Sequence, residues 1–259
     1  MRLARAALIG AVGLALAGGA TLWLSPALRK DVHDRVLRTV AADAIMERAV
    51  ARLDDRLARV GATRGSPVFV RIFKEEAELE LWTRGKADGP WRRAHTYPIC
   101  AHSGDLGPKL AEGDRQAPEG FYRVGAKQLL PTSRYYRAFN IGFPNAFDRS
   151  LDRTGSFLMV HGGCVSIGCY AMTDEGVAEI YTAVEAALDA GQSGVAVHAF
   201  PFRMTPERMA KARGSRWFSY WRNLAEGYRL FEETGAVPRA GTADGRYTFN
   251  GNGTAIRAW

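Results

Sequence analysis

The sequence MVHGGCVSIGCYAMTD, from Met159 to Asp174, is the most informative stretch of the 259-residue chain. The residues that lead into it, 156–161, are typical of a short β-strand. Apolar residues spaced by three and four predict a helix over residues 173–191, which Thr173 or Asp174 can cap. The glycine-rich segment between them is a strand-to-helix loop, and such loops often carry functional residues.

This loop holds the residue types that a cysteine nucleophile needs. A cysteine requires a base to form the thiolate, because the free thiol has a pKa of about 8.5. His161 stands eight residues before Cys169, near enough after a loop reversal to accept the proton. The backbone N–H groups at Gly168 and Cys169, with the Ser166 hydroxyl, could stabilise the oxyanion that forms when a carbonyl is attacked.

Spacing alone leaves two other interpretations of these residues open. The first is a zinc site, because His161, Cys164 and Cys169 are three good zinc ligands close together. The fourth ligand would come from Cys100, His102 or His198. The second is a buried, unreactive thiol beside a hydrogen-bonded core histidine, since cysteine is among the most buried residue types.

Working outward, the chain reads as short strands separated by turn-rich connections. Alternating apolar residues over 68–73 and 77–82 predict a β-hairpin. We expect further strands at 98–100, 120–124 and 195–200, and further helices at 205–213 and 217–234. The tail from residue 240 onward is glycine-rich and matches neither pattern. The expected class is α+β.

The N-terminal part has a different composition. Arg2 and Arg5 precede an uncharged stretch over residues 6–24, which is the charge order of a secretory signal or a membrane anchor. Apolar residues over 27–62 recur at three- and four-residue steps and predict an amphipathic helix or helix pair. The expected domains are a signal or anchor (1–26), a helical spacer (27–64), the β-rich domain with the cysteine loop (65–201) and C-terminal helices with a tail (202–259).

Charge and composition limit the partners. A net charge of +8 and 47% hydrophobic residues describe a basic globular protein and exclude whole-chain disorder. We expect no nucleic-acid partner, because the basic residues are scattered and the leader points out of the cytoplasm. Three cysteines cannot all pair within one chain. Cys100 and Cys164 could be core thiols, disulfide partners or residues that line the site.

Several blocks of sequence occur together in one order. They read VFVRIFKEE from Val68, YPIC from Tyr97, LGPKL from Leu106, EGDRQAPEGFY from Glu112 and NIGFPN from Asn140, followed by the cysteine loop. With this order the chain resembles the L,D-transpeptidase catalytic (YkuD) domain family of bacterial cell-wall enzymes, and its YafK-like subgroup in particular. The resemblance covers about residues 68–233.

The resemblance implies a mixed β-sheet sandwich with a helix beside the active loop, here with an N-terminal helical segment and C-terminal helices. It implies that Cys169 attacks the L-centre carbonyl of diaminopimelate in a peptidoglycan stem peptide and forms a thioester. His161 would act as base and then as acid, oriented by a backbone carbonyl near Gly162 or Gly163. The acyl group would pass to an amine or to water. No cofactor or metal is implied.

The same resemblance suggests substrates and a location. Hydrolysis of the amide that joins a lipoprotein to peptidoglycan is an activity of part of the subgroup, so a peptidoglycan-bound lipoprotein is a candidate partner. A cell-wall enzyme with this leader would be periplasmic, secreted or anchored to the inner membrane. The alternative class is a zinc-stabilised or inactive peptidoglycan-binding module.

Residues for substrate binding can be proposed around the loop. Tyr97 and Tyr170 could flank a groove, and Cys164 could line it. Arg115 and Lys109 lie in a polar loop and could bind stem carboxylates, although such charges are more often solvated.

Two departures from the family pattern concern the second half of the reaction. Only three residues separate Gly162 from Ser166, fewer than in most members, and Ala171 stands where an Arg or Asn is usual. The loss of a guanidinium removes a carboxylate clamp and slightly favours hydrolysis over cross-linking.

Overall fold

The structure is a computed structural model that describes residues 26–86 and 88–250. Two five-stranded sheets form its centre. Sheet A has the strand order β3-β2-β1-β10-β5. Its strands are β1 (Val68–Phe73), β2 (Glu78–Thr83), β3 (Arg92–Pro98), β5 (Gly120–Val124) and β10 (Val195–Phe200).

Sheet B has the order β4-β9-β8-β7-β6 and carries the cysteine loop between two of its strands. Its strands are β4 (Ala101–His102), β6 (Leu129–Ser133), β7 (Tyr136–Asn140), β8 (Met159–His161) and β9 (Tyr170–Ala171). Each sheet contains one parallel pair, β1 with β10 and β8 with β9, among antiparallel neighbours. The α+β class and the mixed sheet sandwich are therefore confirmed.

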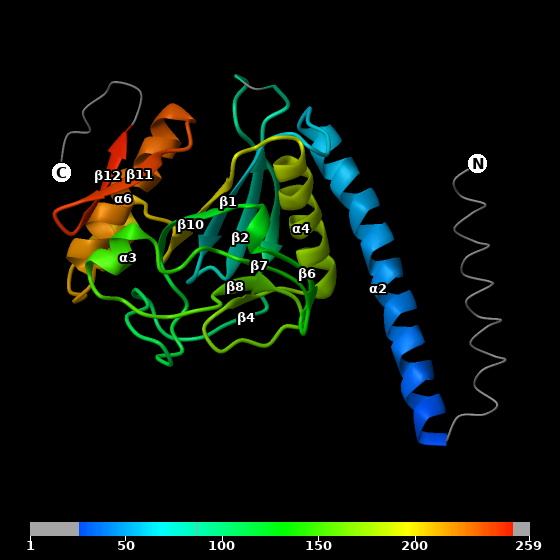
Figure 1. Cartoon of the computed structure of the whole chain (residues 1–259). Coiled ribbons are helices and arrows are strands. Elements are labelled where there is room, and N and C mark those ends of the chain that lie inside the picture. Colours follow the sequence, from blue (N-terminus) through cyan, green and yellow to red (C-terminus); the bar gives the residue numbers. More distant parts are fainter. Residues whose placement is uncertain (1–25, 87, 251–259) are drawn as a thin grey trace. The chain divides into compact units, whose positions relative to one another are not determined.

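Helices and one hairpin complete the chain. The helices are α2 (Pro26–Arg59), α3 (Ala146–Ser150), α4 (Asp174–Asp189), α5 (Pro206–Lys211) and α6 (Phe218–Thr234), with a 3₁₀ turn η2 (Ala126–Gln128). The hairpin pairs β11 (Arg239–Ala243) with β12 (Arg246–Asn250). In Figure 1, α4 runs beside the strands of sheet B. Helix α6 and the hairpin lie together at the other end of the two sheets.

Sheet A is covered on both faces, which explains why β1 is buried at every position. The even-numbered residues of β1, such as Val70 and Ile72, join a core with sheet B and α4. The odd-numbered Phe73 faces a second, aromatic core that includes Trp221 of α6 and Tyr247 of the hairpin. The C-terminal helices thus provide the outer cover that sheet A requires.

Helix α2 crosses a division of the chain into two compact units, residues 1–44 and 45–259. Within the second unit, Ala49, Leu53 and Leu57 are buried at four-residue steps. On the same stretch, Arg52 forms an ion pair with Glu179 of α4 at 2.6 Å. The predicted helix or helix pair is a single helix over its described length.

Most local predictions are confirmed, and one strand differs. The hairpin predicted over 68–73 and 77–82 forms as β1 and β2. Thr173 caps α4, as predicted, by accepting a hydrogen bond from the Gly176 amide. The strand expected at 98–100 is instead a crossover between the sheets. The Ile99 amide donates to Ala77 beside sheet A, and the Cys100 amide donates to Ala171 in sheet B.

Candidate active site

Strands β8 and β9 bring the two ends of the cysteine loop together. They pair in parallel, with Val160 opposite Tyr170 and His161 opposite Ala171. Cys169 comes one residue before β9, so the two-residue alternation of strands places its side chain on the same face of sheet B as His161. The imidazole and the thiol therefore belong to neighbouring strands of one sheet face.

The His161 ring is held in one orientation. Its Nδ1 lies 2.6 Å from the Gly162 carbonyl oxygen, and the Tyr135 ring packs against it with centroids 4.9 Å apart. A carbonyl can only accept, so Nδ1 carries the hydrogen and Nε2 is left as the acceptor in the neutral ring. Burial lowers the pKa of His161, and the hydrogen bond to Gly162 opposes this shift. The ring is therefore a neutral base near pH 7.

The Cys169 side chain is half-buried and is the free thiol of the chain. Its Sγ lies 3.5 Å from the Phe157 carbonyl oxygen, to which the S–H can donate. Burial raises the pKa of Cys169, while a backbone hydrogen bond from Met159 and the positive charge of Lys109 act in the opposite direction. At rest this residue is a thiol rather than a thiolate, so it requires a base to become a strong nucleophile.

Ser166 organises the turn before Cys169. Its Oγ accepts hydrogen bonds from the amides of Gly168 and Cys169, at 3.3 and 3.0 Å, and donates to the Cys169 carbonyl at 2.7 Å. The expectation that its hydroxyl donates to a substrate oxyanion needs correction for this state, because that hydrogen is already used. The two amides do converge on a single oxygen position, as an oxyanion-binding pair must.

The first half of the loop is fixed by close backbone packing. The Gly163 amide donates to Asp174 Oδ1 of α4, and the Gly162 amide donates to Tyr135 and Arg137 in the β6–β7 turn region. A Cβ at Gly162 would collide with Asp174 Oδ1 and with the Tyr135 carbonyl. Only glycine allows this approach. The carbonyl that orients His161 is thus itself held from two sides.

A disulfide ties the same loop to the sheet crossover. Cys164 is bonded to Cys100, with the two Cα atoms 5.3 Å apart. The sequence left three roles open for these cysteines, as core thiols, disulfide partners or residues that line the site. The structure shows that they are disulfide partners. It also corrects the candidate binding role of Cys164, since its sulfur is used in the bond, and it deprives the zinc interpretation of a ligand. In the described part of the chain, no three His, Cys, Asp or Glu side chains gather as a metal site.

The loop over residues 103–118 faces the Cys169 turn. The Tyr170 hydroxyl donates to the Pro118 carbonyl at 2.6 Å, and a Cβ at Gly168 would meet the Gln116 carbonyl. Lys109 lies in this loop and is only 4% exposed, paired with Asp114 at 2.5 Å. The expectation of a solvated charge at Lys109 is wrong. The sequence did carry a signal for this burial, because residues 106–110, LGPKL, place apolar neighbours around the lysine.

A fully buried ion pair anchors this facing loop. Lys74 Nζ lies 3.2 Å from Glu119 Oε1 and also donates to the carbonyls of Asp105, Gly107 and Ala117. Glu119 accepts in addition from the Gly107 amide and from the Trp221 indole of α6. Because every partner is satisfied, the charges are tolerated inside the protein. The C-terminal cover is thereby connected to the wall of the site.

The profile described as "L,D-transpeptidase catalytic domain" (YkuD) matches residues 67–199 of the chain. Two curated proteins, both called "Putative L,D-transpeptidase YafK", come from Escherichia coli strain K12 and from E. coli O157:H7. Each is 49% identical to this chain over 183 residues, which is 71% of this chain and 74% of theirs. The chain belongs to the L,D-transpeptidase catalytic-domain family. The resemblance expected from the sequence blocks is confirmed.

The similarity to solved structures is more distant. The helical cell shape determining protein Pgp2 of Campylobacter jejuni, as the K307A mutant, has a TM-score of 0.44 and 22% identity, covering 69% of this chain and 66% of its own. Bd1075 of Bdellovibrio bacteriovorus has a TM-score of 0.37 and 20% identity, covering 64% of this chain and 60% of its own.

Two of the candidate binding residues do not reach the surface of the candidate site. Tyr170 is fully buried, and Tyr97 is 4% exposed with its hydroxyl donating to Glu179. Both serve the core, so the expectation that they flank a groove is corrected. Arg115 stays a candidate, because it is exposed in the loop that faces Gly168. Sequence reasoning missed Tyr135 and Phe157, whose roles depend on contacts across sheet B.

The signal or anchor expected over residues 1–26 falls almost wholly outside the described residues. Among the helices that are described, none has the length and apolar character needed to cross a membrane. The expected signal or anchor over residues 1–26 stays a prediction.

Proposed function

We propose that this chain is a cell-wall cysteine enzyme that cleaves peptidoglycan stem peptides at the L-centre carbonyl of diaminopimelate. The observation that carries the proposal is the state of His161. Its Nδ1 is tied to the Gly162 carbonyl, so Nε2 is free to accept on the sheet face of Cys169, in a domain of the L,D-transpeptidase family. No cofactor is needed for this chemistry.

The reaction would start from an uncharged pair. His161 Nε2 accepts the proton as Cys169 Sγ attacks the carbonyl carbon, and the carbonyl oxygen becomes an oxyanion. The imidazolium then gives its proton to the leaving amine, the C–N bond breaks and a thioester to Cys169 remains. Attack by water, or by an amine, regenerates the thiol and releases the acyl group. His161 acts as base in each attack and as acid in each collapse.

The oxyanion would occupy the position now held by Ser166 Oγ. The amides of Gly168 and Cys169 both donate there, so a substrate oxygen must displace the Ser166 hydroxyl to receive the same two bonds. The positive φ of Gly168, +115°, supports this geometry. Lys109 would add a favourable field for the developing negative charge.

The identity of the second substrate is a finer proposal, and we favour water. Ala171 is fully buried and opposite His161 in the β8–β9 pair, so this position offers no cation to hold an incoming stem. Three large apolar side chains beside Cys169 are exposed: Phe157 (70%), Val165 (54%) and Ile167 (78%). Binding of a polar stem peptide alone would not explain why these apolar side chains are exposed together.

A polypeptide leaving group would use that apolar surface. We therefore propose hydrolysis of the amide that joins a lipoprotein to diaminopimelate, at the periplasmic side of the inner membrane, where the leader would deliver the enzyme. Hydrolytic release of terminal D-Ala from stem peptides, through the same thioester, is the simpler form of this activity.

The test is incubation of the full chain with purified sacculi, with and without covalently bound lipoprotein. Mass spectrometry of the released and retained muropeptides identifies the products. Cys169→Ala should abolish turnover, and the intact mass of the wild-type protein under quenched turnover should show an acyl group that hydroxylamine removes. Release of lipoprotein or terminal D-Ala without new cross-links supports hydrolysis.

Two outcomes would contradict parts of the proposal. New diaminopimelate–diaminopimelate cross-links would make the enzyme a transpeptidase and overturn the preference for water. Full turnover by Cys169→Ala would exclude the thioester altogether.

A further inference from the structure

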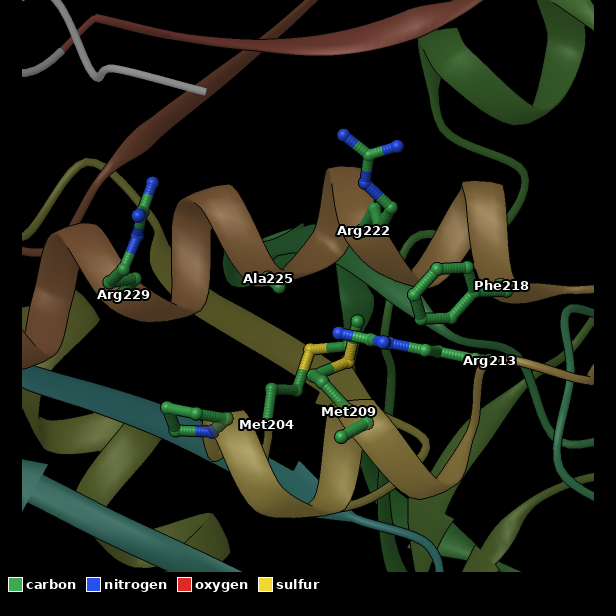
Figure 2. Close-up of a pocket in the computed structure, with 9 residues that line it drawn as sticks. Met204, Met209, Arg213, Phe218, Arg222, Ala225 and Arg229 are labelled. Atoms are coloured by element: carbon green, nitrogen blue, oxygen red, sulfur yellow. The ribbon is translucent and has the colours of Figure 1, made fainter. Parts of the chain in front are cut away.

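A cavity lies between α5 and α6, outside the stretch that matches the L,D-transpeptidase profile. It has a volume of about 350 Å³, which is within the roughly 300–1,000 Å³ range of small-molecule pockets. Its apolar lining includes Met204, Met209, Phe218 and Ala225. Figure 2 shows the two methionine side chains between the helices, with Phe218 at one end. Met204 and Ala225 are 6% exposed and belong to the aromatic core, so the floor is rigidly supported.

Three arginines line the same cavity. Arg213 follows α5, and Figure 2 shows its side chain extending between the helices beside the methionines. Arg222 and Arg229 stand on α6, and Figure 2 shows both side chains pointing away from α5 and from the methionines. Within the described residues, neither Arg213 nor Arg222 has a carboxylate within 4.0 Å, while Arg229 lies 3.7 Å from Glu233. Arg213 therefore supplies the positive charge that lies beside the methionines.

These two features together select the chemistry of a ligand. A flat polar ligand would gain nothing from a floor of methionine and phenylalanine, and a neutral apolar ligand would gain nothing from the Arg213 guanidinium beside it. Methionine is unbranched and adaptable, and so suits a flexible aliphatic chain. A single acyl chain with an anionic head satisfies both the floor and Arg213.

We infer that the cavity between α5 and α6 binds a free single-chain anionic amphiphile, with its acyl chain on the methionine floor and its carboxylate at Arg213. This site is separate from the proposed peptidoglycan chemistry. Its occupancy is expected to be unchanged by Cys169→Ala.

The test uses the full chain and dodecanoate below its micelle concentration, followed by isothermal titration calorimetry and native mass spectrometry. Dodecanoate should bind with one-to-one stoichiometry. Acetate, which has the head without the chain, and dodecyl maltoside, which has the chain without the charge, should each bind at least tenfold more weakly.

Variants separate the role of Arg213 from general electrostatics. Arg213→Gln should weaken dodecanoate binding about tenfold, as expected for loss of a charge-assisted hydrogen bond. Arg216→Gln is the matched control, because Arg216 stacks on Trp217, 4.5 Å from its centroid, and does not line the cavity. It makes the same charge change and should leave the affinity unaltered. Ala210→Phe, at an exposed lining position, should block the cavity while the melting temperature is retained.

The inference is overturned by any of three results. These are no binding of dodecanoate, equal loss of affinity in Arg213→Gln and Arg216→Gln, or binding to anionic phospholipid vesicles without binding of monomeric dodecanoate. The last result would mean that the arginines form a membrane-facing patch rather than a ligand site.

Discussion

His161 and His198 are both buried strand histidines, on sheets B and A, and their surroundings differ in one decisive respect. His161 has a fixed carbonyl partner for Nδ1 and stands on the sheet face of a free thiol. His198 is enclosed by aromatic rings, with Phe69 and Phe121 each 4.7 Å away between centroids. Burial lowers the pKa of both rings. Burial alone therefore does not mark a catalytic histidine, whereas an oriented ring beside a nucleophile does.

The largest expected effect comes from removing the oriented ring. His161→Gln should lower kcat/KM on stem-peptide substrates by about 10²- to 10⁴-fold, because general base catalysis typically contributes that much. His198→Gln is the matched variant on the other sheet and should change kcat/KM by less than about threefold, because His198 lies outside the Cys169 site. Equal losses in the two variants, at equal folded fractions, would end the distinction drawn between the two histidines.

The next effect concerns the disulfide that anchors the loop after His161. Replacing both Cys100 and Cys164 with serine should lower the free energy of unfolding by about 2–4 kcal/mol, because the bond closes a long loop in the unfolded chain. Chemical denaturation of oxidised and reduced wild type gives the same comparison. Cys169→Ala should respond to reductant as wild type does. An insensitive wild type would mean that the loop is held by its backbone hydrogen bonds alone.

The aromatic histidine is expected to affect stability through pH. Burial, assisted by the charge of Arg71, lowers the pKa of His198 to about 3. In the unfolded chain that pKa is about 6.5, so below pH 6.5 the unfolded state binds a proton that the native state does not. Wild type should then lose up to about 1.4 kcal/mol per pH unit relative to His198→Phe between pH 6 and pH 4. Parallel stability curves for the two proteins would contradict a neutral His198.

The smallest effects are shifts of titration midpoints at the proposed site. The acid limb of kcat/KM should have its midpoint below pH 6.5, because burial lowers the pKa of His161. Alkylation of Cys169 by iodoacetamide should rise with a midpoint above pH 9, because burial raises the pKa of the thiol. A midpoint near pH 7 would instead indicate a thiolate–imidazolium pair at rest.

Local sequence patterns predicted much of the fold. The alternation over 68–73 and the capped periodicity over 173–191 correspond to β1 and α4, because turns, caps and side-chain periods depend on neighbouring residues. The hairpin of β11 and β12 escaped prediction. Strand β11 is exposed at four of its five positions, and the hairpin owes its place to Tyr247, which packs against Phe147 and Phe121.

For the candidate site, the motif residues were identifiable and their surroundings were not. His161 and Cys169 could be singled out from one short stretch of sequence. The burial of Tyr170 and the role of Tyr135 beside the imidazole depend on which strands lie next to each other in sheet B. A contact across a sheet has no signature in the spacing of either residue.

The sequence by itself determined the family, the α+β class and the cysteine–histidine motif, because these reside in residue types and short-range spacing. Only the tertiary structure decided that Cys164 pairs with Cys100, that Lys74 neutralises Glu119 inside the protein and that Lys109 is buried near the thiol. Each of these depends on segments that lie 45 or more residues apart in the sequence and are brought together by folding. The free energy of such contacts comes from burial and charge pairing, which exist only once the sheets have packed.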